Sequence, residues 1–165
     1  MPAQPQSTAR TDLEIDRAAH TIRMTRVFGA APAEIFAAWT QPEHVTCWWD
    51  AAGEPLRVCE IDLRPGGAFT FVSRGQPDMA FAGTYHEIAP PERLVFEAMG
   101  ATGRVLLQDI AGGTHMTVEI ACGSAEQLEQ YLKMGVDTGT SQTLDNLVAH
   151  VRRSEATLDE VMRKA

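Results

Sequence analysis

Six short segments that favour β-strands follow one another in the middle of the chain, with only a few residues between them. In the last of them, the apolar side chains of Met116, Val118 and Ile120 alternate with polar ones. Such alternation is typical of a strand that has one buried and one solvated face. Strands joined by short connections pair with their neighbours in antiparallel order. The six segments are residues 56–63, 68–74, 79–88, 93–99, 104–110 and 114–121.

Helical segments flank these strands. A further strand is expected first, at residues 21–28, and Pro32 and Pro42 then each open a short helix, because proline at the first helical position loses no needed hydrogen bond. At the other end, apolar residues recur at helical spacing over residues 128–151, where Gly135 and Gly139 favour a kink or a break. We therefore predict an α+β fold, with a curved antiparallel seven-stranded sheet around a long C-terminal helix and two short helices after the first strand. A sheet curved around a helix leaves a cavity, which the short helices close at one end.

Length and charge limit the classes of protein that remain. The 165 residues fit one domain, which we expect over 21–153, with a mobile tail at 1–20 and a fraying end at 154–165. The formal net charge of −8 disfavours binding to nucleic acid or to an anionic membrane surface. The sequence shows no apolar run of membrane-spanning length and no secretory leader, so we expect a cytoplasmic protein.

A series of short motifs runs in order between Thr25 and Val151. These motifs are residues 26–32, 38–44, 48–49, 61–67, 83–85, 91–96, 112–114 and 139–147. In this order and spacing they resemble the SRPBCC (START-like) superfamily, in particular the bacterial branch grouped with the activator of heat shock protein 90 ATPase. The resemblance implies a helix-grip fold with a hydrophobic ligand cavity. It implies no universal catalytic residue, since members include ligand carriers, cyclases and co-chaperones.

One position departs from the pattern of that family. Similar proteins usually carry Gly-Trp in the last helix, whereas Gly139 is followed here by Thr140. Replacing an indole by a hydroxyl removes a large apolar volume from the wall of the cavity. We therefore expect either a larger cavity or another side chain that fills the gap.

The candidate lining of the cavity consists mainly of aromatic, methionine and aliphatic side chains. The alternative is that these side chains are the ordinary packing of a core. Trp48 and Trp49 are adjacent, so they cannot both face inward, and one of them is expected to lie at the mouth or partly exposed. The candidates are Trp39, Trp48, Trp49, Phe69, Phe71, Met79, Phe81, Tyr85, Phe96, Met116, Val136, Thr140 and Leu144.

Three residues are candidates for polar chemistry in this cavity. Tyr85 and Thr140 carry hydroxyls that would need a partner if buried. Glu87 has the same strand parity as Phe81 and Tyr85, so it is a weak candidate, with Tyr85, for a catalytic acid or base. The alternative for Glu87 is a solvated strand end.

No metal or cofactor is expected. His44 and Cys47 have helical i, i+3 spacing, but no second pair of His or Cys completes a set of ligands. Cys47, Cys59 and Cys122 are an odd number at irregular spacing, which argues against a disulfide framework. The sequence also has no glycine-rich phosphate loop and no dinucleotide fingerprint.

Three functions are consistent with these observations. The first is binding of a small hydrophobic or aromatic molecule in the cavity, which needs no catalytic group. The second is a cyclase- or hydrolase-type enzyme that uses the same cavity. The third, implied by the family resemblance alone, is an interaction that assists a chaperone ATPase. An exposed sheet edge beside the N-terminal tail makes a homodimer a further expectation.

Overall fold

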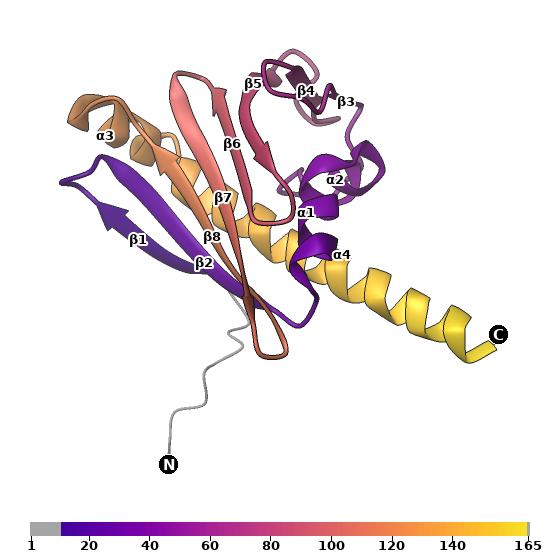
Figure 1. The fold of residues 1–165 in the computed structure, drawn as a ribbon. Helices are drawn as coiled ribbons and strands as arrows, with labels where there is room; N and C mark the ends of the chain where they lie inside the picture. Colours follow the sequence, from indigo (N-terminus) through magenta and orange to yellow (C-terminus); the bar gives the residue numbers. More distant parts are fainter. Residues whose placement is uncertain (1–10, 165) are drawn as a thin grey trace.

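The computed structural model describes the backbone of residues 11–164 and the side chains of residues 11–153. An antiparallel eight-stranded sheet curves around one face of a long helix (Figure 1). The sheet order is β1-β2-β8-β7-β6-β5-β4-β3, so among the described strands β2 and β8 are the one pair of neighbours that is not consecutive in the chain, which crosses from β2 to β3 at the far edge. The strands are β1 (Asp12–Asp16), β2 (Thr21–Phe28), β3 (Val58–Ile61), β4 (Ala68–Val72), β5 (Ala80–Ala89), β6 (Arg93–Ala98), β7 (Ala101–Ile110) and β8 (Gly113–Ala121). The helices are α1 (Pro32–Thr40), α2 (Pro42–Trp48), α3 (Ala125–Lys133) and α4 (Val136–Lys164).

The predicted α+β fold is confirmed, but the sheet has one strand more than the seven expected. The additional strand, β1, lies within the tail expected at residues 1–20, and it places the two short helices after the second strand. Leu13 and Ile15 pair with Met24 and Ile22 of β2. Arg23 forms ion pairs with acidic side chains of β1 on the other face. The sequence hid this strand because it has only two apolar residues, and pairing with β2 across the turn at residues 17–20 supplies the rest of its stability.

The C-terminal helical region is two helices. Ser124 caps α3 by accepting a hydrogen bond from the backbone N–H of Gln127 at 3.1 Å. Gly135 then adopts a φ of +77°, which ends that run and lets α4 start in a new direction. The break expected near Gly135 is thus confirmed, whereas Gly139 lies inside α4. The backbone of α4 is helical to Lys164, and the fraying expected from residue 154 stays a prediction. Residues 1–10 of the expected tail lie outside the described residues.

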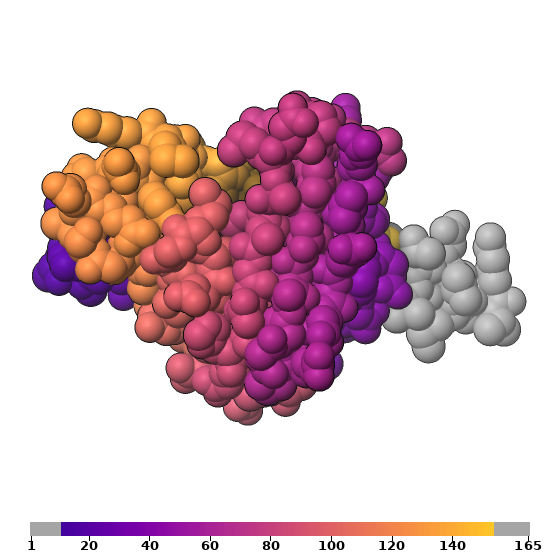
Figure 2. Space-filling model, turned by 90° about the horizontal axis from the view of Figure 1, so that it is seen from above, coloured from indigo at the N-terminus to yellow at the C-terminus, as the bar shows by residue number. Residues whose placement is uncertain are grey.

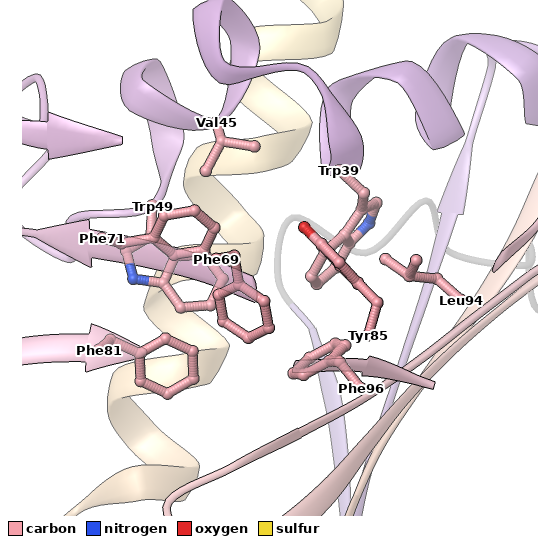
Figure 3. A pocket seen from close by; sticks show the side chains of 9 residues that line it. All are labelled: Trp39, Val45, Trp49, Phe69, Phe71, Phe81, Tyr85, Leu94 and Phe96. Atoms are coloured by element: carbon pink, nitrogen blue, oxygen red, sulfur yellow. The ribbon is translucent and has the colours of Figure 1, made fainter. Parts of the chain in front are cut away.

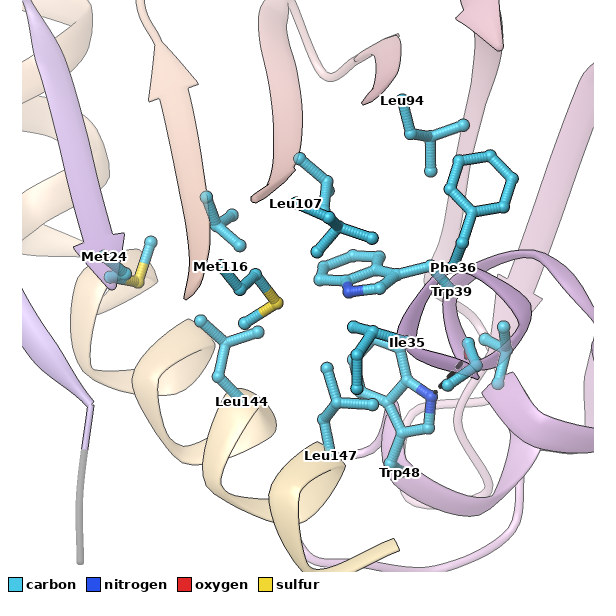
Figure 4. Packing of buried hydrophobic residues seen from close by; sticks show 14 of the residues in the cluster. Met24, Ile35, Phe36, Trp39, Trp48, Leu94, Leu107, Met116, Leu144 and Leu147 are labelled. Carbon is cyan, nitrogen blue, oxygen red and sulfur yellow. Dashed lines mark hydrogen bonds between the residues drawn. The ribbon is translucent and has the colours of Figure 1, made fainter. Parts of the chain in front are cut away.

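The core lies between the sheet and the helices α1, α2 and α4 (Figure 4). Met24 and Met116 project from β2 and β8 toward Leu144 and Leu147 of α4, and all four are completely buried. Their packing holds the first half of α4 against the β2–β8 side of the sheet. The far side, β3 to β6, is covered by α1 and α2 instead, because these helices follow β2 and cross to that end (Figure 1).

A buried ion pair also joins the sheet to α4. Arg26 lies on the inward side of β2, and its side chain is only 4% exposed. Its Nη1 donates to Oδ1 of Asp145 on α4 at 2.8 Å, and the Thr11 hydroxyl donates to the same oxygen at 3.1 Å. This contact fixes α4 relative to β2 in addition to the apolar packing.

The end of the molecule that carries α3 and the start of α4 is hollowed at its surface. Viewed from above, a hollow separates α3 and the start of α4, in orange and gold, from the strands in magenta (Figure 2). The turns that join β4 to β5 and β6 to β7 lie at this end of the sheet (Figure 1). None of the described helices is both long enough and apolar enough to cross a membrane.

Candidate functional site

A small cavity lies between the helices α1 and α2 and the inner face of strands β4, β5 and β6 (Figure 3). Its volume is about 10 Å³, close to the room that one water molecule needs. Nine side chains surround it; none of them is charged, and seven are aromatic. They are Trp39, Val45, Trp49, Phe69, Phe71, Phe81, Tyr85, Leu94 and Phe96.

Strand register brings most of these rings together. Phe69 and Phe71 lie two residues apart on β4, so both face inward. Phe71 pairs with Phe81 of β5, and Tyr85 of β5 pairs with Phe96 of β6. Because partners in neighbouring strands point to the same face, the register gathers five aromatic side chains under the two short helices.

The rings are close enough to fill most of this space. The centroid of Trp49 lies 4.9 Å from that of Phe71 and 5.1 Å from that of Phe81. Phe69 lies 5.0 Å from Tyr85 and 5.2 Å from Phe71. These distances are typical of aromatic side chains in direct contact. Trp49 and Phe81 are only partly buried, so they form the solvent side of the cluster.

Gly103 of β7 leaves room for one of these rings. It pairs with Phe96, and a Cβ atom at this position would lie 2.5 Å from ring carbons of Phe96. Any side chain larger than hydrogen would therefore displace the ring. The sheet is thus shaped on this side to accommodate the aromatic cluster.

The structure places seven of the thirteen predicted lining residues around the cavity and six elsewhere. Met79 lies in the loop before β5 and is 62% exposed. Met116 and Leu144 pack between the sheet and α4, outside the cavity (Figure 4). Val136 and Thr140 are partly buried at the start of α4 and do not line it.

The sixth residue placed elsewhere is Trp48, which is completely buried in the core. Its indole Nε1 donates to the backbone carbonyl of Ala38 at 2.9 Å, and its ring meets that of Trp39 edge-on. Trp49 is the partly exposed member of the pair and lines the cavity. Adjacent residues on a helix point about 100° apart, which sends one ring into the core and the other toward the sheet.

Two lining residues, Val45 and Leu94, were absent from the sequence-based candidates. Val45 lies one helical turn before Trp49 on α2, and Leu94 lies two residues before Phe96 on β6. Both follow the periodicity of an aromatic residue that had been identified, so the same signal would have found them. They escaped because aliphatic side chains occur throughout any core.

The larger cavity considered for Thr140 stays a prediction. Thr140 does not line the cavity, whose volume is about 10 Å³. The rings of β4, β5 and the end of α2 occupy the space under the short helices instead. The second alternative, filling of the gap by other side chains, also stays a prediction.

The suggestion that Glu87 faces the cavity is wrong. A β-bulge shifts the register between Tyr85 and Glu87, so that Glu87 pairs with Val95 on the outer side and Ile88 takes the inward position opposite Leu94. The carboxylate of Glu87 is half-exposed and accepts from Nε of Arg93 at 3.1 Å. The strand end is solvated, and the cavity has no carboxylate among its described lining residues.

Tyr85 is the lining residue with a phenolic hydroxyl. The residue is 3% exposed, and its oxygen points away from β5, toward α1 and α2 (Figure 3). Burial raises the pKa of Tyr85 far above its ordinary value, and the nearby Cys59 thiol raises it further. The hydroxyl therefore stays protonated at any physiological pH and acts as a hydrogen-bond donor.

The histidines and cysteines do not gather into a metal site within residues 11–153. No group of three or more potential ligands occurs there. His44 contacts His150 of α4 instead of Cys47: its Nδ1 lies 2.9 Å from Nε2 of His150. The pair links α2, which carries Trp49, to α4.

This histidine pair is expected to make stability depend on pH. Burial lowers the pKa of His150, with smaller effects in the same direction from His44 and Arg153. The unfolded chain therefore binds more protons than the folded one as pH falls below about 6.5. We expect the free energy of unfolding to decrease from pH 7.5 to pH 5.5, as measured by urea denaturation. A His150→Leu variant should show a weaker dependence.

His86→Gln is the matched control for that measurement, because the His86 side chain is exposed on the sheet. This variant should keep the dependence of the wild-type protein. An equally steep dependence in His150→Leu would contradict the assignment to His150.

Comparison with known proteins identifies relatives of this fold. A family model described as "Activator of Hsp90 ATPase homolog 1-like protein" matches residues 29–152. No curated protein sequence matches this chain.

Several solved structures are similar along most of their length. A Mycobacterium smegmatis protein is 24% identical with a TM-score of 0.76, covering 88% of this chain and 99% of its own. A Rhodobacter sphaeroides protein is 21% identical with a TM-score of 0.77, covering 87% and 98%. An AHSA1-like protein from Aeromonas hydrophila is 21% identical with a TM-score of 0.69, covering 82% and 94%. At this level of identity, the similarity shows a shared fold.

Proposed function

The chain belongs to the Activator of Hsp90 ATPase homolog 1-like family, and on this basis we propose that it binds a small hydrophobic or aromatic molecule at the cavity under α1 and α2. The observation that carries the proposal is the lining: nine uncharged side chains, seven of them aromatic, converge from α1, the α2 segment and three strands. Ligand sites are typically concave and apolar, with few polar groups.

The volume of the cavity determines how such a molecule would enter. A cavity of about 150 Å³ accommodates benzene, whereas this one measures about 10 Å³. Binding therefore requires aromatic side chains to move. Trp49, Phe81 and Phe96 are the partly buried rings of the lining, and Trp49 and Phe81 contact each other, so displacing these two together breaks fewer core contacts than displacing the fully buried rings.

Binding is favoured over catalysis by the chemistry of the lining. The enzyme alternative relied on Glu87 or Tyr85 as acid or base, and Glu87 faces away from the cavity. Tyr85 alone remains there, with a pKa raised well above the range in which a general acid–base catalyst operates near neutral pH. The chaperone interaction rests on the family description, and it stays a prediction, as does a homodimer.

Native mass spectrometry of the purified protein tests the proposal. We expect an additional mass that denaturing extraction releases as a small apolar compound. Phe81→Arg introduces a charge into the lining and should abolish this adduct. Met79→Arg is the matched control, because Met79 lies two residues away but is exposed outside the cavity, and it should retain the adduct.

Two results would count against the proposal. One is an adduct that survives in Phe81→Arg, which would place the bound compound elsewhere. The other is a protein without adduct that also fails to bind any member of a panel of apolar and aromatic molecules in a thermal-shift assay.

A further inference from the structure

The lining of the cavity contains one strongly buried hydroxyl, that of Tyr85. The side chain is almost completely buried, yet its hydroxyl oxygen stays accessible, since Nε1 of Trp39 is the fully buried side-chain polar atom without a partner among the described residues. The other tyrosine of the chain, Tyr131, is also buried, and its hydroxyl donates to the backbone carbonyl of Met99. Tyr131 thus uses its hydroxyl within the fold, whereas the hydroxyl of Tyr85 is left free to donate to a bound molecule.

The remaining polar atoms of the lining lie elsewhere on its rings. The indole nitrogens of Trp39 and Trp49 lie on the sides of their rings that face away from the Tyr85 oxygen (Figure 3). Nε1 of Trp39 is buried without a partner and lies on the side of Ile35, in the core (Figure 4). The hydroxyl of Tyr85 is therefore the donor positioned between α1, α2 and the sheet, where the cavity lies.

Charge restricts the ligand further. No acidic or basic side chain lines the cavity, so a charged ligand would lose its hydration without gaining a counter-charge. Because the phenol of Tyr85 stays protonated, it suits a neutral acceptor such as a carbonyl oxygen. The surrounding rings favour an aromatic molecule, since edge and face contacts between rings add to simple burial.

We propose that the cavity selects neutral aromatic molecules that carry a hydrogen-bond acceptor, and that the Tyr85 hydroxyl donates to that acceptor. This inference rests on the proposed function, because it assumes a ligand at the cavity. The acceptor atom takes the small space beside the hydroxyl, about the size of one water molecule. The ring of the ligand takes the volume that Trp49 and Phe81 release when they move.

Two probes with the same phenyl ring and two-carbon side chain separate the acceptor from the ring: acetophenone, which has a carbonyl oxygen, and ethylbenzene, which does not. Each is titrated into the full-length protein while the indole N–H signals of Trp39 and Trp49 are followed by NMR. The N–H signal of Trp48 should shift less, since this group donates within the core and does not line the cavity. In Tyr85→Phe, the ratio of the ethylbenzene Kd to the acetophenone Kd should fall about fivefold relative to the wild-type protein.

Tyr131→Phe is the matched control, because it removes the other buried tyrosine hydroxyl, which lies outside the cavity. This variant should leave the ratio unchanged. Circular dichroism confirms that both variants fold, and the phenylalanine ring retains the apolar packing of each site. Benzoate, which is similar in size but charged, should bind at least tenfold more weakly than acetophenone.

The outcomes separate the two proposals. An equal ratio in the wild-type protein and Tyr85→Phe, or tight binding of benzoate, overturns the selection of neutral acceptors but leaves binding at the cavity in place. If neither neutral probe shifts the signals of Trp39 and Trp49, the inference fails. The adduct experiment with Phe81→Arg then decides the proposed function independently.

Discussion

Replacing Asp145 by alanine is expected to lower the free energy of unfolding by about 3 kcal/mol. The side chain of Arg26 is almost completely buried, and Asp145 is its ion-pair partner at 2.8 Å. Burial lowers the pKa of Arg26, while the proximity of Asp145 opposes that effect, so the carboxylate stabilises the charged guanidinium. Without Asp145, a buried charge remains unpaired, and the Thr11 hydroxyl also loses its acceptor.

Urea denaturation monitored by circular dichroism measures this effect. Asp62→Ala is the matched control, because Asp62 forms an ion pair with Arg64 at 2.9 Å in which both side chains are exposed, and its loss should cost less than about 1 kcal/mol. The double variant Arg26→Met, Asp145→Leu should recover most of the loss, since two apolar side chains leave no unpaired charge. Equal costs for Asp145→Ala and Asp62→Ala would contradict the role of burial.

Truncation of Trp48 should have an effect of similar or larger size. Trp48→Ala is expected to cost about 3 to 5 kcal/mol, because it removes a completely buried indole and leaves a cavity between α1, α2 and α4. The Ala38 carbonyl also loses the hydrogen bond from the indole. This is a large part of the total stability of a typical domain.

The neighbouring tryptophan is the natural comparison for that variant. Trp49 is only partly buried, so Trp49→Ala should cost clearly less in the same denaturation assay. It should instead enlarge the cavity, because the ring lines it. A cost for Trp49→Ala equal to that for Trp48→Ala would mean that the aromatic cluster is part of the same core and opens no more readily.

The candidate site could be predicted in part from alternation along single strands. Phe69 and Phe71 share one face of β4 by simple period-two spacing, and seven of the predicted residues surround the cavity. The same rule failed for Glu87, because a bulge inserted after Tyr85 reverses the parity of the rest of β5. A bulge depends on how two strands pair, and neither strand shows it alone.

The prediction of lining residues was wrong for a different reason at three positions that lie in the core. Trp48, Met116 and Leu144 are apolar and face inward, as expected. They pack in the core beside α4, however, and not around the cavity. Composition does not distinguish a residue that faces a cavity from one that faces a helix. The distinction depends on where α4 crosses the sheet (Figure 1).

Local patterns thus determined the order of strands and helices, the helix starts at Pro32 and Pro42, and the break near Gly135, because each depends on residues within a few positions of one another. Tertiary structure alone decided the eighth strand, the outward turn of Glu87, the pairing of Arg26 with Asp145 and the nearly complete filling of the cavity. Each of these depends on how one element pairs or packs with another, and the energies of such contacts are gained only when the sheet and helices come together.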